Sequence, residues 1–342
     1  MLGYRAPVQP DPVTFGQQLA DGFALGPVVS LQAGGVGANG RIWRLRTETD
    51  DVAVKQLFGG PEAAALDPVA VREVAFAEAG RVAGVLAPRQ RTDRFGRFAS
   101  RASTGTVRVA DWVEGTAVRP SDLAAAAWAG WVMATLLGLG FPVGTDEVDR
   151  WYTVPPTEER WETLVRAADR AGAFWSVRLR RQVPELLNLA DLVGRVDASG
   201  LAWCHTDIQA QNAVRRPDGR YELLDWDEAG PVVPVYALAR LLVDWSVDWT
   251  DEGTATVYPD RLEAVLRGYR SGGGTSVPRS VDDFGGLVAG TLNFLAGQAE
   301  LALGAGYPTD LRATGDAQVR RLLRHPLTRA TLDRVADLVR AA

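Results

Sequence analysis

Hydrophobic and polar positions alternate in short runs over the first hundred residues, and these runs predict β-strands. Residues 27–32 form a short apolar run, residues 41–47 alternate apolar and basic side chains, and residues 52–57 are rich in β-branched side chains. Residues 107–113 predict a further strand at the edge of the same sheet. Residues 69–83 have a helical period instead. The sequence therefore predicts a small β-rich region with one helix.

From residue 121 onward the pattern changes to long stretches rich in Ala, Leu and Trp with helical spacing, interrupted only at residues 201–227 by a strand, a loop and a hairpin. The uncharged run 123–143 is long enough to span a membrane, but its Gly and Pro content and the spacing of its bulky residues favour a buried helix. We therefore predict an α+β fold with a β-rich region over 1–110, a hinge over 111–115 and a helical region over 116–342.

Composition and charge exclude several classes of protein. The chain has 342 residues, a formal net charge of −5 and no basic arm, so binding of nucleic acid through bulk positive charge is excluded. One Cys and two His provide neither an internal disulfide framework nor a Cys/His metal site. The N-terminus lacks a basic segment followed by an apolar run. We expect a cytoplasmic protein without membrane or nucleic-acid partners, present as a monomer or a homodimer.

One cation stands out from the others. The chain has 37 Lys and Arg residues, and because Lys55 is the only lysine, the other 36 are arginine. The two residue types are interchangeable on a solvated surface but not where a compact point charge is needed. Lys55 lies within the predicted strand 52–57, so we predict that its ammonium group has a specific role.

Residues 201–230 carry the densest set of candidate catalytic groups. Asp207 and Asn212 lie five residues apart on the predicted loop, and Asp225 and Asp227 follow the predicted hairpin. Carboxylates and an amide at both ends of a hairpin are oxygen ligands suited to a divalent hard cation. Phosphoryl transfer needs such a cation, together with a carboxylate that orients or deprotonates the attacking hydroxyl.

The pattern HxDxxxxN, followed by two strands and DxD, resembles the catalytic hairpin of the aminoglycoside phosphotransferase family. The resemblance implies a protein-kinase-like two-lobe fold, with a nucleotide-binding N-lobe and a helical C-lobe that holds the catalytic loop and the acceptor cleft. It also implies that Asp207 is the catalytic residue that faces the acceptor hydroxyl. Asn212 and Asp225 would be Mg²⁺ ligands, with Asp227 as a second carboxylate nearby.

Other parts of the chain match this family in the expected order. The glycine cluster at 34–40 is similar to its nucleotide loop, and Lys55 stands where a kinase strand places the lysine that contacts the phosphates of ATP or GTP. Glu73 is the expected partner of Lys55, with Glu78 as the alternative if the helix register differs. Residues 108–115 resemble the hinge that holds the nucleobase. The implied nucleotide-binding residues are Gly34, Gly35, Gly37, Asn39, Lys55, Glu73, Asp111 and Val113.

The acceptor site is expected in residues 244–252. On a helix, Asp244 and Asp248 would share one face, while Trp245 and Trp249 would share an adjacent face. Carboxylates beside aromatic rings suit a cationic or sugar-bearing ligand, and we therefore predict these four residues as substrate contacts. The alternative is a packed Trp stripe with solvated acids.

The resemblance to this family leaves three functions to consider. The preferred one is a Mg²⁺-dependent kinase that uses ATP or GTP to phosphorylate a hydroxyl of an antibiotic of the aminoglycoside, macrolide, peptide or nucleoside type, because the Arg- and Ala-rich composition fits a GC-rich genome in which such resistance enzymes are common. The second is a metabolic kinase for an amino sugar, choline or homoserine. The third is a non-catalytic nucleotide-binding protein.

Overall fold

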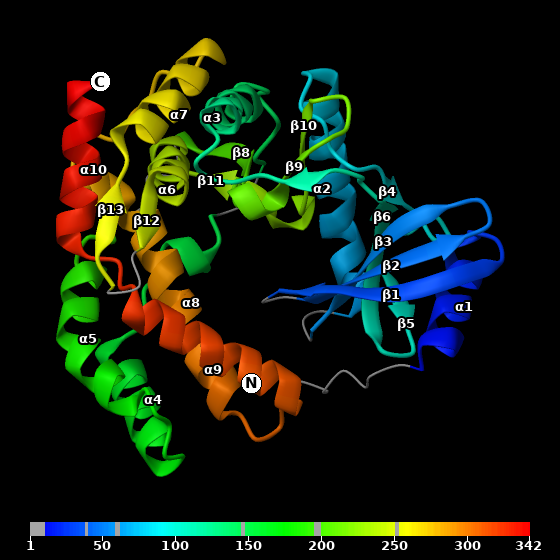
Figure 1. Cartoon of the computed structure of the whole chain (residues 1–342), viewed down its shortest axis with the longest axis horizontal. Coiled ribbons are helices and arrows are strands. Elements are labelled where there is room, and N and C mark those ends of the chain that lie inside the picture. Colours follow the sequence, from blue (N-terminus) through cyan, green and yellow to red (C-terminus); the bar gives the residue numbers. More distant parts are fainter. Residues whose placement is uncertain (1–10, 38–39, 59–61, 145–147, 195–199, 250–252) are drawn as a thin grey trace. The chain divides into compact units, whose positions relative to one another are not determined.

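The structure of the chain, a computed structural model, describes residues 11–37, 40–58, 62–144, 148–194, 200–249 and 253–342. The chain divides into two compact units. The colours of Figure 1 follow the sequence from the N-terminus (blue) to the C-terminus (red). Unit 1 comprises Met1–Thr116 and Val214–Asp227, and unit 2 comprises Ala117–Ala213 and Glu228–Ala342. The predicted α+β class, with a β-rich first part and a helical second part, is confirmed. The segment Val214–Asp227 was expected in the helical lobe but belongs to unit 1.

Unit 1 is built on an antiparallel sheet of strand order β1-β2-β3-β6-β4, with β5 also paired to β6 (Figure 1). The prediction of an edge strand at 107–113 is wrong, because that strand pairs with β3 on one side and with β4 and β5 on the other. Its Val107 and Val109 are buried, as expected for an inner strand. The strands are β1 (Val28–Val36), β2 (Gly40–Thr47), β3 (Asp51–Leu57), β4 (Gln90–Arg91), β5 (Ser100–Ala102) and β6 (Gly105–Asp111).

Among the residues described in the N-terminal part of unit 1, two helices, α1 and α2, accompany the sheet. The helix α1 (Pro12–Phe23), which the sequence analysis missed, begins after Asp11, whose side chain accepts a hydrogen bond from the backbone N–H of Thr14. Its buried face packs on the sheet, where Phe15 meets Trp43 edge-on with ring centroids 5.8 Å apart. The second helix, α2 (Ala63–Val82), begins earlier than predicted.

The hairpin that follows the predicted catalytic loop, which contains Asp207, is anchored to α2. It consists of β9 (Ala213–Arg215) and β10 (Tyr221–Leu223), and it is followed by η4 (Trp226–Glu228). Trp226 Nε1 donates to the backbone oxygen of Leu223 at 2.7 Å, and its ring packs against Phe76 at 5.9 Å. These contacts fix the place of the two aspartates that flank Trp226.

Unit 2 is mainly helical, and the chain passes into it within β7 (Thr116–Ala117). A Cβ at Gly268 would lie 1.7 Å from the backbone oxygen of Ala127, so only glycine allows α3 and α7 to approach this closely. The helices are α3 (Leu123–Leu137), α4 (Glu158–Arg170), α5 (Ser176–Ala190), α6 (Pro234–Ser246), α7 (Pro259–Ser271), α8 (Gly285–Leu303), α9 (Thr309–Arg324) and α10 (Arg329–Ala341), with the short η1 (Arg150–Tyr152), η3 (Ala210–Asn212) and η5 (Val281–Phe284).

Two short antiparallel strand pairs lie among these helices. One joins β8 (Ala202–His205) to β11 (Ala229–Val232), and the other joins β12 (Val247–Trp249) to β13 (Ala255–Val257). The run 123–143 contains the buried helix α3, as predicted. In the described part of the chain, no helix has both the length and the apolar character that a membrane crossing requires.

Candidate active site

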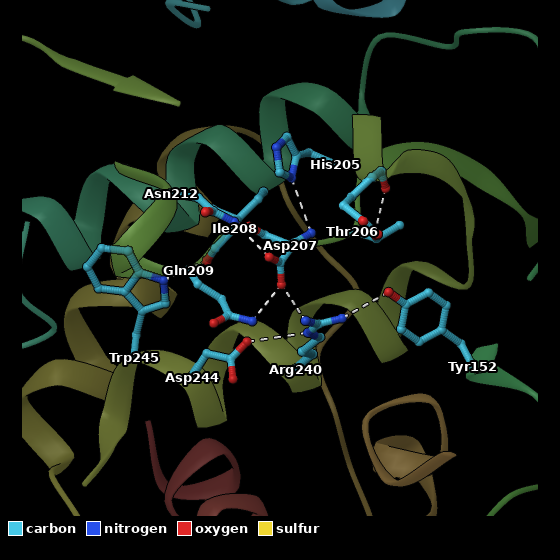
Figure 2. A network of polar contacts seen from close by, with 11 residues as sticks. Tyr152, His205, Thr206, Asp207, Ile208, Gln209, Asn212, Arg240, Asp244 and Trp245 are labelled. Atoms are coloured by element: carbon cyan, nitrogen blue, oxygen red, sulfur yellow. Dashed lines mark hydrogen bonds and ion pairs between the residues drawn. The ribbon is translucent and has the colours of Figure 1, made fainter. Parts of the chain in front are cut away.

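The backbone of the predicted catalytic loop, which follows β8 in unit 2, is held at three points (Figure 2). The N–H of Asp207 donates to Nδ1 of the fully buried His205 at 3.1 Å. The hydroxyl of Thr206 donates to the backbone oxygen of Glu228 at 2.5 Å. On the other side, Nε1 of Trp245 donates to the backbone oxygen of Ile208 at 2.8 Å. The loop is therefore positioned by β8, β11 and α6 together.

The structure brings Asp207 and Asn212, two of the predicted site residues, together within unit 2. Nδ2 of Asn212 donates to Oδ2 of Asp207 at 2.7 Å and to its backbone oxygen at 3.0 Å. Oδ1 of Asp207 accepts a hydrogen bond from Nε2 of Gln209 at 2.5 Å and another from Arg240. The Asp207 carboxylate is thus fixed in one orientation by three side chains (Figure 2).

Arg240 on α6 is a charged residue of this site that the sequence analysis did not identify. Besides Asp207, it contacts Oδ2 of Asp244 through Nε at 3.4 Å and the hydroxyl of Tyr152 through Nη1 at 3.2 Å. Burial and the nearby charge of Asp207 raise the pKa of Asp244 to about 6, although Arg240 acts in the opposite direction. A signal was available, since Arg240 and Asp244 are four residues apart, the spacing of ion pairs along a helix.

A second polar cluster lies in unit 1. It consists of Lys55, Asp225 and Asp227, three of the predicted site residues, and is called the Lys55 cluster below. Nζ of Lys55 is 2.6 Å from Oδ1 of Asp225 and 2.9 Å from Asp227, and only 15% of the lysine side chain is exposed. Asp225 has a backbone φ of +62°, in the left-handed region that residues other than glycine adopt rarely. Burial and the charge of Asp227 raise the pKa of Asp225 to about 6. Burial would also raise the pKa of Asp227, but Lys55 and Arg108 lower it to about 2.

The predicted pairing of Glu73 with Lys55 requires a correction. Glu73 is buried on α2, and its carboxylate lies 2.6 Å from Nη1 of Arg108. Arg108 on β6 is the cross-strand neighbour of Lys55 on β3, so it occupies the place next to Glu73 that the lysine was expected to fill. Among the ion pairs of described residues, those of Lys55 involve the two aspartates. The alternative, Glu78, is exposed and pairs with Arg81.

We expect the protein to be sensitive to the loss of either partner of the Glu73–Arg108 pair, because both side chains are buried. Removal of one partner leaves an uncompensated charge in the core, so Glu73→Ala should lower the free energy of unfolding by about 3 kcal/mol. Urea unfolding followed by circular dichroism measures this change. The double variant Glu73→Leu/Arg108→Met should recover most of the loss, whereas Glu78→Ala serves as a solvated control. Equal losses in Glu73→Ala and Glu78→Ala would contradict the assignment.

The glycine cluster lies at the end of β1 and the start of β2. Gly34 and Gly35 lie where the β1–β2 register shifts, and the N–H of Gly37 donates to the backbone oxygen of Gly40 at 2.8 Å. A Cβ at Gly40 would lie 2.7 Å from the backbone oxygen of Gln56, so the strands approach closely beside Lys55. Asn39, also predicted to bind nucleotide, lies outside the described residues.

The predicted hinge follows β6. The carboxylate of Asp111 lies 2.6 Å from Nε of Arg91, and its backbone N–H donates to the oxygen of Arg89. Trp112 continues the pairing by donating to the backbone oxygen of Asp51 at 3.0 Å, and Val113 is half-buried. The side chain of Asp111 is therefore engaged within the sheet, and the role of Asp111 and Val113 in holding a nucleobase stays a prediction.

The predicted acceptor helix is wrong. The helix α6 ends at Ser246, and Asp248 and Trp249 lie on β12, so they share no helical face with Asp244 and Trp245. Trp245 is fully buried and supports the loop through its ring nitrogen, which agrees with the alternative of a packed Trp. Asp248 pairs with Arg261 at 2.8 Å. Asp244 contacts Arg240 beside Asp207, and Trp245 contacts the loop backbone at Ile208.

The predicted metal ligands are divided between the two units. Asn212 belongs to unit 2, whereas Asp225 and Asp227 belong to unit 1. Within either unit, as far as its residues are described, no group of three or more His, Cys, Asp or Glu residues is arranged for a metal ion. The donor types nevertheless fit Mg²⁺. The two aspartates carry one more negative charge than Lys55 neutralises, and Asn212 uses its Nδ2 toward Asp207, which leaves its amide oxygen as an acceptor.

Comparison with solved structures gives the same fold over nearly the whole chain. The spectinomycin phosphotransferase APH(9)-Ia, in complex with ADP and spectinomycin, is 12% identical with a TM-score of 0.64, and 97% of this chain and 100% of that chain are covered. The amicoumacin kinase hAmiN, in complex with AMP-PNP and Ca²⁺, is 13% identical with a TM-score of 0.60 and coverage of 94% and 97%. The choline kinase LicA from Streptococcus pneumoniae is 16% identical with a TM-score of 0.51 and coverage of 91% and 98%. A search of curated proteins found no match.

The sequence profile of one family matches most of the chain. The match covers residues 30–275, from β1 to just beyond α7, and it includes both the Lys55 cluster and the Asp207 loop. The motifs and the fold agree with this match. The chain therefore belongs to the phosphotransferase enzyme family, the aminoglycoside phosphotransferase type whose catalytic hairpin its residues 201–230 resemble.

Proposed function

We propose that the chain transfers the terminal phosphoryl group of ATP or GTP to a hydroxyl of an antibiotic, in a Mg²⁺-dependent reaction. As a member of this family it is a phosphotransferase with an alcohol group as acceptor. The observation that carries the proposal is the orientation of Asp207, whose carboxylate is fixed by Asn212, Gln209 and Arg240. A carboxylate held in this way can align an acceptor hydroxyl for attack on phosphorus.

The Lys55 cluster is the proposed phosphate-binding part. Its buried ammonium group supplies a compact positive charge for phosphate oxygens, and the ion pairs to Asp225 and Asp227 hold that charge in place before a nucleotide binds. A bound Mg²⁺, held by Asn212, Asp225 and Asp227, would neutralise charge on the transferring phosphoryl group. Gly40 of the glycine cluster lies at the same end of the sheet as Lys55, since it pairs with Leu57 and a Cβ there would lie 3.4 Å from Cγ of Lys55. Glycines at such a place would let the backbone approach phosphate oxygens.

An antibiotic is the acceptor that we favour. Two of the similar structures are a spectinomycin phosphotransferase and an amicoumacin kinase, and both extend over nearly the whole of this chain. A metabolic acceptor is the second candidate, supported by the similarity to a choline kinase. Phosphate transfer from ATP or GTP, measured against a panel of hydroxyl-bearing antibiotics and a panel of amino alcohols and amino sugars, distinguishes the two candidates.

We predict that nucleotide stabilises the protein only when Mg²⁺ is present. A ligand that binds only the folded state adds RT ln(1 + [L]/Kd), which is about 2.7 kcal/mol at a concentration of about 100 Kd. Thermal unfolding should therefore shift upward with ATP or GTP plus Mg²⁺, and the shift should vanish when a chelator is added.

A matched pair of variants on the hairpin tests the ligand assignment. Asp225→Asn should abolish most of the nucleotide-dependent shift, because it removes a carboxylate from the Lys55 cluster. Asp218→Asn, at the exposed hairpin turn, should retain the full shift, since that side chain pairs with Arg220 and lies outside the cluster. An undiminished shift in the presence of chelator, or in Asp225→Asn, would argue against the Mg²⁺ site.

A further inference from the structure

The two oxygens of the Asp207 carboxylate differ in how the protein uses them. Oδ1 accepts two hydrogen bonds, one from Nε2 of Gln209 at 2.5 Å and one from Nη2 of Arg240. Oδ2 accepts one, from Nδ2 of Asn212 at 2.7 Å. Each carboxylate oxygen has about two lone-pair sites. Among donors of the described residues, both sites of Oδ1 are therefore taken, and one site of Oδ2 is left for a further donor (Figure 2).

Arg240, one of the two donors to Oδ1, also contacts two other side chains. Nε of Arg240 reaches Oδ2 of Asp244, one turn further along α6, and Nη1 reaches the hydroxyl of Tyr152. The side chain of Arg240 is only 21% exposed. Each of its three nitrogens thus contacts a different group. This arrangement requires the planar, forked guanidinium group, and an ammonium group cannot reproduce it.

Tyr152 in turn packs against α8. A Cβ at Gly290 would lie 3.1 Å from the Tyr152 ring, so the absence of a side chain at this position makes room for the ring. Nδ2 of the buried Asn293 donates to the backbone oxygens of Trp151 and Val154, each at 2.9 Å, and fixes the segment that carries Tyr152. The position of Arg240 is therefore set by two helices, α6 and α8, and by η1.

We propose that Arg240 is a positioning residue for phosphoryl transfer, an inference that rests on the proposed function. Together with Gln209 it occupies Oδ1 of Asp207 and so assigns Oδ2 to the acceptor hydroxyl. In the reaction, the acceptor oxygen forms a bond to the terminal phosphorus of the nucleotide while the bond from that phosphorus to the bridging oxygen breaks. The hydroxyl proton passes to Oδ2, and the nucleoside diphosphate leaves.

The test compares Arg240→Ala and Arg240→Lys with Arg320→Ala. Arg320 on α9 also pairs with an aspartate four residues away, Asp316, but lies outside the network around Asp207, so it controls for the loss of a helical ion pair. The measured reaction is release of phosphate from ATP or GTP with water as the acceptor, which needs no identified substrate. Thermal unfolding confirms that each variant is folded.

We expect Arg240→Ala to lower kcat by about 100-fold while KM for the nucleotide changes by less than about threefold, because misalignment acts on transfer and not on nucleotide binding. Arg240→Lys should recover little, since an ammonium group cannot serve all three partners. Added guanidinium ion at low concentration should restore activity to Arg240→Ala and leave Arg320→Ala unchanged. Rescue by guanidinium is a result that a merely structural ion pair would not give.

Three results would overturn the inference. The first is a kcat for Arg240→Ala equal to or above that of the wild type, the second is full activity in Arg240→Lys, and the third is no rescue by guanidinium.

Side-chain NMR of the Arg240 guanidinium group provides a second measurement, which does not depend on enzymatic activity. Rotation about the Nε–Cζ bond of Arg240 should be slow in the wild type and faster in Asp207→Asn, and equal rates in both would also overturn it. Absence of phosphate release and of nucleotide binding in the wild type would instead count against the proposed function, while the NMR result still decides whether Arg240 is held by Asp207.

Discussion

Asp207→Asn should lower turnover by about 10²–10⁴-fold while nucleotide affinity and stability stay close to those of the wild type. The substitution is nearly isosteric, and the amide retains one oxygen to accept a hydrogen bond from Arg240 or Asn212. It removes the negative charge and the acceptor site for the hydroxyl proton. Because phosphoryl transfer depends mainly on positioning and electrostatics, much of the loss would come from a misaligned hydroxyl.

The matched comparison for this variant is Asp225→Asn. Asp225 lies in the Lys55 cluster and belongs to the proposed phosphate and Mg²⁺ site, so its variant should weaken nucleotide binding itself. Isothermal titration with ATP or GTP plus Mg²⁺ and steady-state phosphate release separate the two effects. Loss of nucleotide affinity in Asp207→Asn, with loss of turnover alone in Asp225→Asn, would show that the two roles are exchanged.

Local patterns in the sequence were sufficient to predict the central strands. The predicted strands at 41–47 and 52–57 differ from Gly40–Thr47 and Asp51–Leu57 by one residue at the start of each. Alternation and β-branched side chains are properties of the segment itself, so no distant contact is needed to detect them. The helix α1 was missed although its signals are local: Asp11 precedes Pro12, and Phe15 and Leu19 recur at helical spacing.

The other errors concern features that depend on distant parts of the chain. Asp248 and Trp249 continue the helical spacing of α6, but pairing of Val247–Trp249 with Ala255–Val257 makes the segment a strand. Such pairing is invisible in a local count of positions. In the same way, Glu73 was correctly placed on a helix, but its partner Arg108 follows from the register of β3 against β6.

The same distinction between local signals and distant contacts applies to the candidate site. Lys55, Asp207, Asn212 and Asp225 were chosen as candidate site residues from residue type and order along the chain. Within each unit, Lys55 contacts Asp225 and Asn212 contacts Asp207, and the roles of these residues stay predictions. Arg240 was not identified, because one arginine among 36 carries no compositional signal. Its four-residue spacing to Asp244 indicates an ion pair along the helix but not the contact with Asp207, which depends on the packing of α6 beside the loop.

Lys55→Arg should be nearly as damaging as Lys55→Met, with phosphate release lowered by at least about 100-fold in both. Nζ of Lys55 fits between two carboxylates at 2.6 and 2.9 Å, and the strand beside it is packed so closely that a Cβ at Gly40 would lie 3.4 Å from Cγ of the lysine. A guanidinium group is wider and forked. It would keep the charge but displace the aspartates and any phosphate placed by the ammonium group.

The reciprocal exchange at a solvated position provides the control for this variant. Arg46→Lys, on the same sheet, changes one basic side chain into the other where 48% of the arginine is exposed and its ion pair to Asp51 is long. Activity should change there by less than about twofold, because exposed ion pairs contribute little. If Lys55→Arg kept most of the activity, as Arg46→Lys is expected to do, the single lysine of this chain would have no role that an arginine cannot fill. A large loss at position 55 alone would mean that the compact ammonium group, held between Asp225 and Asp227, is what the reaction requires.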